Sequence, residues 1–179
     1  MSQFDVAVGM NADTLGQGMT QLYAKPDART KLFKGSLPGT LSGQSYVASW
    51  DIQAAPTFTL QPPPSDQWAA SIDPTGKHPT DAAPTQNAFQ LVFPTFYGQY
   101  TLGTSTVSGT TKVIVFATAS VSGSTLVITP KSIWLDESQM GGWDKAILNV
   151  ILKQVLVQAA KLLQGIQIPP LTFSVVSGT

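Results

Sequence analysis

The chain contains 179 residues, with ten Lys and Arg against ten Asp and Glu for a formal net charge of zero. This length predicts a single domain spanning residues 1–179. A neutral chain has no global field to recruit nucleic acid, which excludes a generic nucleic-acid-binding protein. Charged residues make up only 11% of the chain, so solubility must come from neutral polar groups, chiefly 16 Ser and 20 Thr.

Cysteine is absent, and His78 is the only histidine. Disulfides, thiolate zinc sites, iron–sulfur clusters and cysteine nucleophiles are therefore excluded, and so is a histidine-rich metal site. We expect no metal and no other cofactor. The first ten residues lack the basic start and the continuous apolar run of a secretory signal. We therefore expect a cytoplasmic protein, or one secreted without a cleaved signal peptide.

Apolar periodicity predicts the elements of the first 60 residues. Residues 3–10 alternate as a strand does, and a short helix follows that ends near Pro26. Residues 41–60 return to a period of two and predict one long strand, bent or broken near Pro56. The helix has Asn11 or Asp13 as its N-cap and carries Leu15, Met19, Leu22 and Tyr23 on one face. One face of the strand carries Tyr46, Ala48, Trp50, Ile52 and Ala54.

A proline-rich loop region and a sheet follow. Residues 61–86 hold six prolines, which cannot donate to a sheet, and only residues 67–72, around Trp68, predict a short strand. Beyond them, four strands with short connections predict an antiparallel meander with one face wetted by Ser and Thr. These strands span residues 88–93, 96–106, 111–121 and 125–135, with turns at Pro94, Ser108-Gly109 and Ser122-Gly123-Ser124.

Residues 144–164 predict a helix of roughly 30 Å whose apolar side chains cover most of its circumference. A surface helix buries a stripe little wider than about 100°, so other elements should wrap this one. Its three lysines and several amides argue against a transmembrane segment. Residues 171–176 predict a last strand. The order predicts an α+β domain in which a curved antiparallel sheet wraps one long C-terminal helix, with a short N-terminal helix beside it.

Few residues suggest catalysis. His78 could act as a general base oriented by Asp81. A solvated loop histidine is the favoured interpretation, because no triad partner stands at a recognisable spacing. Residues 43–47 lack the second glycine of the serine-hydrolase elbow and begin a strand, whereas the elbow needs a strand-to-helix turn.

Two smaller motifs have structural interpretations. Gly16 and Gly18 resemble a fragment of a phosphate-binding loop, but no third glycine or lysine completes it, so they predict close packing of the short helix. Asp136 and Glu137 are adjacent and should point apart, which predicts a solvated turn rather than an acid pair. We therefore expect a protein that is not an enzyme.

Aromatic residues gather on the predicted strands, at positions that share a parity with aliphatic residues. The simpler interpretation is an ordinary packed core. The alternative is that the concave sheet face and the long helix do not close completely and leave a tubular apolar cavity for an acyl chain or a similar ligand. The aromatic residues are Trp50, Trp68, Trp134, Trp143, Phe89, Phe93, Phe96, Tyr97 and Tyr100.

Two stretches of the chain resemble a known family. Residues 4–22 read as a strand, Phe-Asp-Val-Ala-Val, followed by a helix with Leu15 and Met19, and the long helix ends in Leu-Leu-Gln-Gly-Ile-Gln-Ile-Pro-Pro-Leu over residues 162–171. This pattern is similar to one module of the TULIP (tubular lipid-binding) superfamily, which includes bactericidal/permeability-increasing protein. The resemblance implies a long helix wrapped by a curved sheet, with lipid in the seam between them.

The absence of cysteine and a length suited to one module place the resemblance nearest to bacterial members, the accessory proteins of clostridial neurotoxin gene clusters. Some proteins of that branch bind lipid only weakly, or act mainly as partners in larger assemblies. The resemblance thus implies either lipid binding or a role in protein–protein interaction.

Two functional hypotheses follow. In the first, the protein binds a lipid, a fatty acid or another elongated hydrophobic ligand between helix and sheet, gaining about 25 cal/mol per Å² of apolar area removed from water. In the second, the same fold has a closed core and serves as a structural or assembly component, either a homo-oligomer or an accessory protein of a toxin complex. The ligand-binding residues expected under the first are Leu148, Leu152, Leu156, Ala159 and Leu163 of the helix, facing Trp50, Ile52, Phe89 and Leu91 of the strands.

Overall fold

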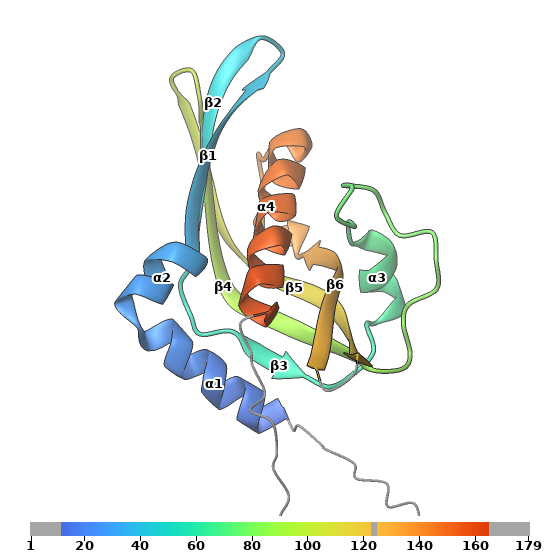
Figure 1. The fold of residues 1–179 in the computed structure, drawn as a ribbon. Helices are drawn as coiled ribbons and strands as arrows, with labels where there is room; N and C mark the ends of the chain where they lie inside the picture. Colours follow the sequence, from blue (N-terminus) through green and yellow to red (C-terminus); the bar gives the residue numbers. More distant parts are fainter. Residues whose placement is uncertain (1–11, 123–124, 165–179) are drawn as a thin grey trace, which may run out of the picture.

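The computed structural model describes residues 12–122 and 125–164 and shows an α+β fold, in which a curled antiparallel sheet wraps around one long helix (Figure 1). The sheet has six strands: five follow the order β1-β2-β4-β5-β6, and β3 pairs with β4. The predicted general class is confirmed. The strands expected at residues 3–10 and 171–176 lie outside the described residues. The elements are α1 (Ala12–Ala24), α2 (Pro26–Leu32), β1 (Lys34–Leu41), β2 (Gln44–Ile52), β3 (Thr57–Thr59), α3 (Ser65–Ala70), β4 (Ala88–Leu102), β5 (Ser105–Ser122), β6 (Thr125–Leu135), the 3-10 turn η1 (Glu137–Gln139) and α4 (Lys145–Gln164).

The predicted short helix is present as α1, but a second helix follows it directly. Pro26 opens α2, because proline at the first position of a helix forfeits no hydrogen bond. Met19 of α1 is buried, and the ring of Tyr23 meets that of Phe33 edge to face with 5.0 Å between centroids. These contacts anchor the helical pair to the end of the core next to β3 (Figure 1).

Residues 41–60 do not form the single strand that their pattern predicts. β1 and β2 pair as a hairpin, and a two-residue turn joins them in which Ser42 has a φ of 49° and Gly43 a φ of 81°. Such left-handed pairs match the twist of antiparallel strands. β3 is a separate strand beyond Pro56. The inward face of β2 is as predicted, with Tyr46, Ala48, Trp50 and Ile52 all buried, whereas Ala54 lies beyond its end.

The predicted meander has three long strands instead of four. Pro94 lies in an irregularity of β4 that does not end the strand, since a bulge tolerates a residue without an N–H. The turn between β4 and β5 includes Gly103, whose φ is 60°, and the pair Ser108-Gly109 lies inside β5. β5 ends at Ser122 and β6 begins at Thr125, close to the predicted bounds of these strands, and the two residues between them lie outside the described part of the chain.

Residues 67–72 do not form the predicted strand, because residues 65–70 are the helix α3. Trp68 packs from α3 on Ile114 and Phe116 of β5, and its indole Nε1 donates to the carbonyl oxygen of Asp81 at 2.8 Å. The neighbours of these two β5 residues along the strand face α4, so this small cluster lies on the opposite, outer face of the sheet. The predicted wetted face is therefore covered here.

The long predicted helix is confirmed as α4. The Oδ1 atom of Asp144 accepts hydrogen bonds from the backbone N–H groups of Ala146 at 2.8 Å and Ile147 at 3.3 Å, a side-chain N-cap. α4 lies in the concave face of the sheet, against β6 and β2 (Figure 1). The wide apolar arc is thereby wrapped, although Val157 stays 48% exposed. Within the described part of the chain, no helix has the length and apolar character needed to span a membrane.

Candidate functional site

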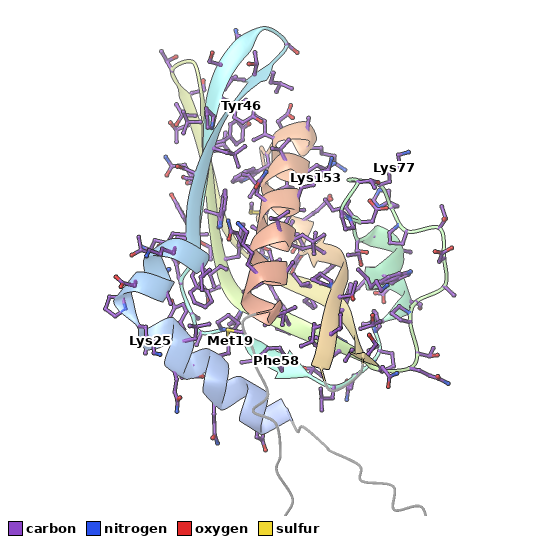
Figure 2. All side chains as sticks on the ribbon, viewed as in Figure 1. Met19, Lys25, Tyr46, Phe58, Lys77 and Lys153 are labelled. Carbon is purple, nitrogen blue, oxygen red and sulfur yellow. The ribbon has the colours of Figure 1, made fainter. Side chains whose placement is uncertain are left out.

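The residues predicted to bind ligand converge on one apolar seam between α4 and the sheet, where side chains from both walls fill the space (Figure 2). The helix residues recur every three or four positions and therefore share one helix face. The strand residues are alternate positions of β2 and of β4, which share one sheet face. All nine belong to a single buried cluster and are named here the seam residues: Leu148, Leu152, Leu156, Ala159, Leu163, Trp50, Ile52, Phe89 and Leu91.

The seam is closed. Each seam residue is at most 6% exposed. An empty tube wide enough for an acyl chain would leave accessible surface on the side chains that line it, because solvent-sized space would remain beside them. The low exposure therefore indicates that the two walls contact each other as a packed core.

Other side chains complete this packing, and only some of them were singled out from the sequence. Phe93 and Phe96 were recognised as aromatic residues of predicted strands, and both are fully buried in the same cluster. Others share the inward parity of β5 and β6 or the helix face next to the seam residues. They include Val113, Val115, Ile133, Ile147, Ile151 and Val155.

A row of glycines continues the concave face beyond the seam. In the sheet register, Trp50 pairs with Gly35 on one side and with Gly98 on the other, and Gly98 pairs with Gly109. The ring of Trp50 occupies the space where a side chain at position 35 would stand. Trp143 covers the other two glycines, since a Cβ added at Gly98 would lie 3.0 Å from its ring. Glycine in a strand interior often marks such a close approach, which is the signal that could have revealed this row.

Two indole groups in this region are buried without a partner. The Nε1 atoms of Trp50 and Trp143 have no hydrogen-bond acceptor among the described residues. Tyr100 meets Trp143 edge to face with 5.1 Å between ring centroids, and its hydroxyl lies 3.5 Å from the carbonyl oxygen of Gly142. An unmet indole N–H in an apolar setting carries a desolvation cost of about 1–3 kcal/mol and could be met by an acceptor oxygen.

His78 does not form the alternative dyad with Asp81. Its Nδ1 atom lies 2.8 Å from the carbonyl oxygen of Ser71, while Asp81 is engaged through its backbone carbonyl by Trp68. Among the described hydrogen bonds, none joins the two side chains. His78 is exposed, which agrees with the favoured interpretation of a solvated loop histidine.

The two smaller motifs have different outcomes. A Cβ added at Gly16 or Gly18 would meet no described atom within 4 Å, so the predicted close packing of α1 at these positions is wrong. Gly16 is half-buried and Gly18 is exposed. Asp136 does belong to a turn, because its Oδ1 accepts from the backbone N–H of Ser138 at 3.1 Å. The serine of residues 43–47 lies in the β1–β2 hairpin, which has no strand-to-helix turn.

A charged cluster ties α2 to the first hairpin. Arg29 forms an ion pair with Asp51, Lys34 Nζ lies 3.0 Å from Asp51 Oδ2, and the Arg29 guanidinium stands 4.8 Å from the ring centre of Tyr23. Burial of Asp51 acts to raise the pKa of its carboxyl, but the hydrogen bonds from Arg29 and Lys34 outweigh burial and hold it below its usual value. The cluster is a structural clamp at the edge of the sheet.

A second contact joins α4 to the loop after α3. The side chain of Lys153, labelled in Figure 2, lies against the backbone of Gly76, which has a φ of 84°. Asp73 closes this turn, because its Oδ1 accepts from the backbone N–H groups of Thr75 at 2.8 Å and Lys77 at 3.0 Å. Chiefly the bond from Lys77, and also the Thr75 hydroxyl, holds the pKa of Asp73 below its usual value. The turn holds the loop against the helix.

Nothing in the described ranges 12–122 and 125–164 assembles three His, Asp or Glu side chains in a position to hold a metal ion. The candidate site is therefore the apolar seam and its glycine-lined continuation, with no charged side chain among the seam residues. No protein-family model, curated protein or solved structure matches the chain.

Proposed function

We propose that the protein is a non-enzymatic structural or assembly component, whose core is closed and whose surface makes the functional contacts. One observation carries this proposal: every seam residue is at most 6% exposed, so the space between α4 and the sheet is occupied by the protein's own side chains. The low charge density supports it as well, because a surface rich in Ser and Thr can be buried against a partner with little desolvation of charge.

Lipid binding in the seam is the second candidate. The observation that favours it is the chemistry of the walls, which are wholly apolar and come from separate elements, α4 on one side and β2 and β4 on the other. The unpartnered indole N–H of Trp50 would accommodate one acceptor oxygen of such a ligand. The resemblance to TULIP modules, including the toxin-cluster accessory proteins, fits either candidate. In this case α4 would have to move away from the sheet to admit a ligand.

Native mass spectrometry of the freshly purified protein separates the two candidates. The assembly proposal predicts the bare chain mass of 19.0 kDa or whole-number multiples of it. Added mass that organic extraction identifies as a phospholipid or a fatty acid would overturn the closed core and make lipid carriage the working function. A parallel incubation with oleic acid, followed by the same measurement, tests whether the purified seam can be loaded.

A further inference from the structure

Two hairpins at one end of the molecule carry no acidic or basic residue near their turns. Residues 35–50 and 82–111 contain no Asp, Glu, Lys, Arg or His. The first run includes the β1–β2 turn and the second includes the β4–β5 turn. The two hairpins extend together past the N-terminal end of α4 (Figure 1). We call the parts of these hairpins next to their turns, residues 37–47 and 100–107, the distal end.

The distal end also carries apolar side chains that the rest of the protein covers only in part. Leu37 and Leu41 alternate with two glycines on the inward face of β1. Leu102 and Val107 lie on the inward face of the other hairpin, in register with Tyr46 and Tyr100. All four pack on the core from one side and stay partly exposed on the other, because α4 does not reach them. The apolar core is therefore only partly covered at the distal end.

Strand addition is a poor way to cover this end. The backbone N–H of Ile52 donates to the carbonyl oxygen of Phe33 at 2.8 Å. Since bonded and non-bonded pairs alternate along antiparallel strands, this bond makes Ser36, Pro38 and Thr40 the residues whose backbone groups point away from β2. Pro38 has no N–H and interrupts that outer row, as edge strands that avoid further pairing commonly do. A partner must instead dock on the side chains.

We propose that the distal end docks on the same end of a second copy of this chain, forming a homodimer with two-fold symmetry. The inference rests on the proposed assembly function and specifies its surface. A surface without charge is self-complementary, because two copies can meet without burying an unpaired or repelled charge. An anionic membrane, by contrast, is recruited through basic residues, and these two runs have none.

The inward faces of the two hairpins form one patch at the distal end, because Tyr46 of β2 pairs with Leu102 of β4. Its composition of partly exposed Leu and Val surrounded by Ser, Thr and Gly has the apolar centre and polar rim of such interfaces.

Sedimentation velocity of the full chain, at concentrations from about 1 to about 200 μM, tests the proposal. The wild type should shift from monomer to dimer over this range. The double variant Leu41→Lys with Leu102→Lys should raise the dimer dissociation constant at least about 100-fold, because each copy then brings unpaired charges into the interface. Val157→Lys is the matched control: it places the same charge on an exposed apolar residue of α4 and should leave dimerisation unchanged.

A second pair protects the test against loss of folding. Gln44 and Ser105 are exposed and lie on the same inward face as Leu41 and Leu102, their register partners, so Gln44→Lys with Ser105→Lys adds charge without removing packed side chains and should weaken the dimer in the same way. A wild type that stays monomeric overturns the proposal, and so does a dimer that persists in both double variants. Flotation of a monomeric wild type with phosphatidylcholine vesicles would also overturn it, in favour of a lipid surface. None of these outcomes bears on whether the seam is closed, which mass spectrometry decides separately.

Discussion

The indole ring of Trp50 covers Gly35, its register partner on the neighbouring strand, so that no side chain could stand at position 35. Gly39 and Tyr46, four register pairs further along the same hairpin, repeat this arrangement. An aromatic ring laid over a cross-strand glycine covers the exposed backbone of an edge strand. β1 has glycine at two of its inward-facing positions, so aromatic side chains of β2 fill the core there.

Replacing Gly35 should therefore be costly. In Gly35→Ala, the new methyl group would collide with the ring of Trp50 and displace it from a buried position. Overpacking of this kind costs about 1–3 kcal/mol, so urea unfolding should show a loss of that size. In a Trp50→Leu background, the same Gly35→Ala change should cost less, because the ring it collides with is gone. An unchanged midpoint in Gly35→Ala would contradict the close contact.

Replacing Gly18 should have the opposite effect. Gly18 is an exposed interior residue of α1, and a Cβ there meets no described atom within 4 Å. Alanine restricts the unfolded chain and favours the helix, so Gly18→Ala should raise the free energy of unfolding by about 0.5–1 kcal/mol. The same urea titration measures it. Destabilisation would mean that another part of the protein approaches α1 at this position.

A larger side chain in the seam should destabilise the fold. Leu152 lies in the closed seam, so Leu152→Phe should lower the free energy of unfolding by about 1–3 kcal/mol in thermal or urea unfolding. Val157→Phe, on the exposed side of the same helix, should change it by less than about 0.5 kcal/mol. If Leu152→Phe is as stable as the wild type, the seam has spare volume, and lipid binding becomes the stronger candidate.

Acid should weaken the clamp at Asp51. The folded-state pKa of this carboxyl is lowered, so its contribution to stability is present above the unfolded-state value, about 3.9, and is lost as the pH falls through the folded-state value. The stability of the wild type should thus fall more steeply between pH 5 and about pH 2 than that of Asp51→Asn. Urea unfolding across this range gives both slopes, and equal slopes would show that the ion pair has no energetic role. The slope for Arg29→Met, which removes the main partner of Asp51, should lie between the slopes of the wild type and Asp51→Asn.

Elements with a residue pattern that repeats over many neighbouring positions could be predicted from the sequence alone. The helix at residues 144–164 could be predicted because its apolar residues repeat over many turns and Asp144 supplies a cap. The inward face of β2 followed from strict alternation at Tyr46, Ala48, Trp50 and Ile52. The α+β class and the wrapping of the helix followed from these patterns, because so wide an apolar arc cannot remain in water.

The contacts between these elements could not be predicted in the same way, because they join residues far apart in the chain. β1 depends on the rings of Trp50 and Tyr46, which cover its two glycines. The residues around these glycines carry no local pattern that would reveal this contact. Whether residues 67–72 are strand or helix depends on Trp68 finding Ile114 and Phe116 nearly 50 residues away, on the outer face of the sheet. Short apolar runs fit either structure, so long-range packing selects between them.

The same physical reason separates the two functional hypotheses. The sequence could place the seam residues on facing sides of a helix and a sheet, because periodicity reports direction. It could not report distance, and the difference between an open tube and a closed core is a few ångströms between walls of identical composition. The low exposure of the seam residues favours the closed core, and the charge-free hairpins beyond the end of α4 are the surface that we propose for a partner.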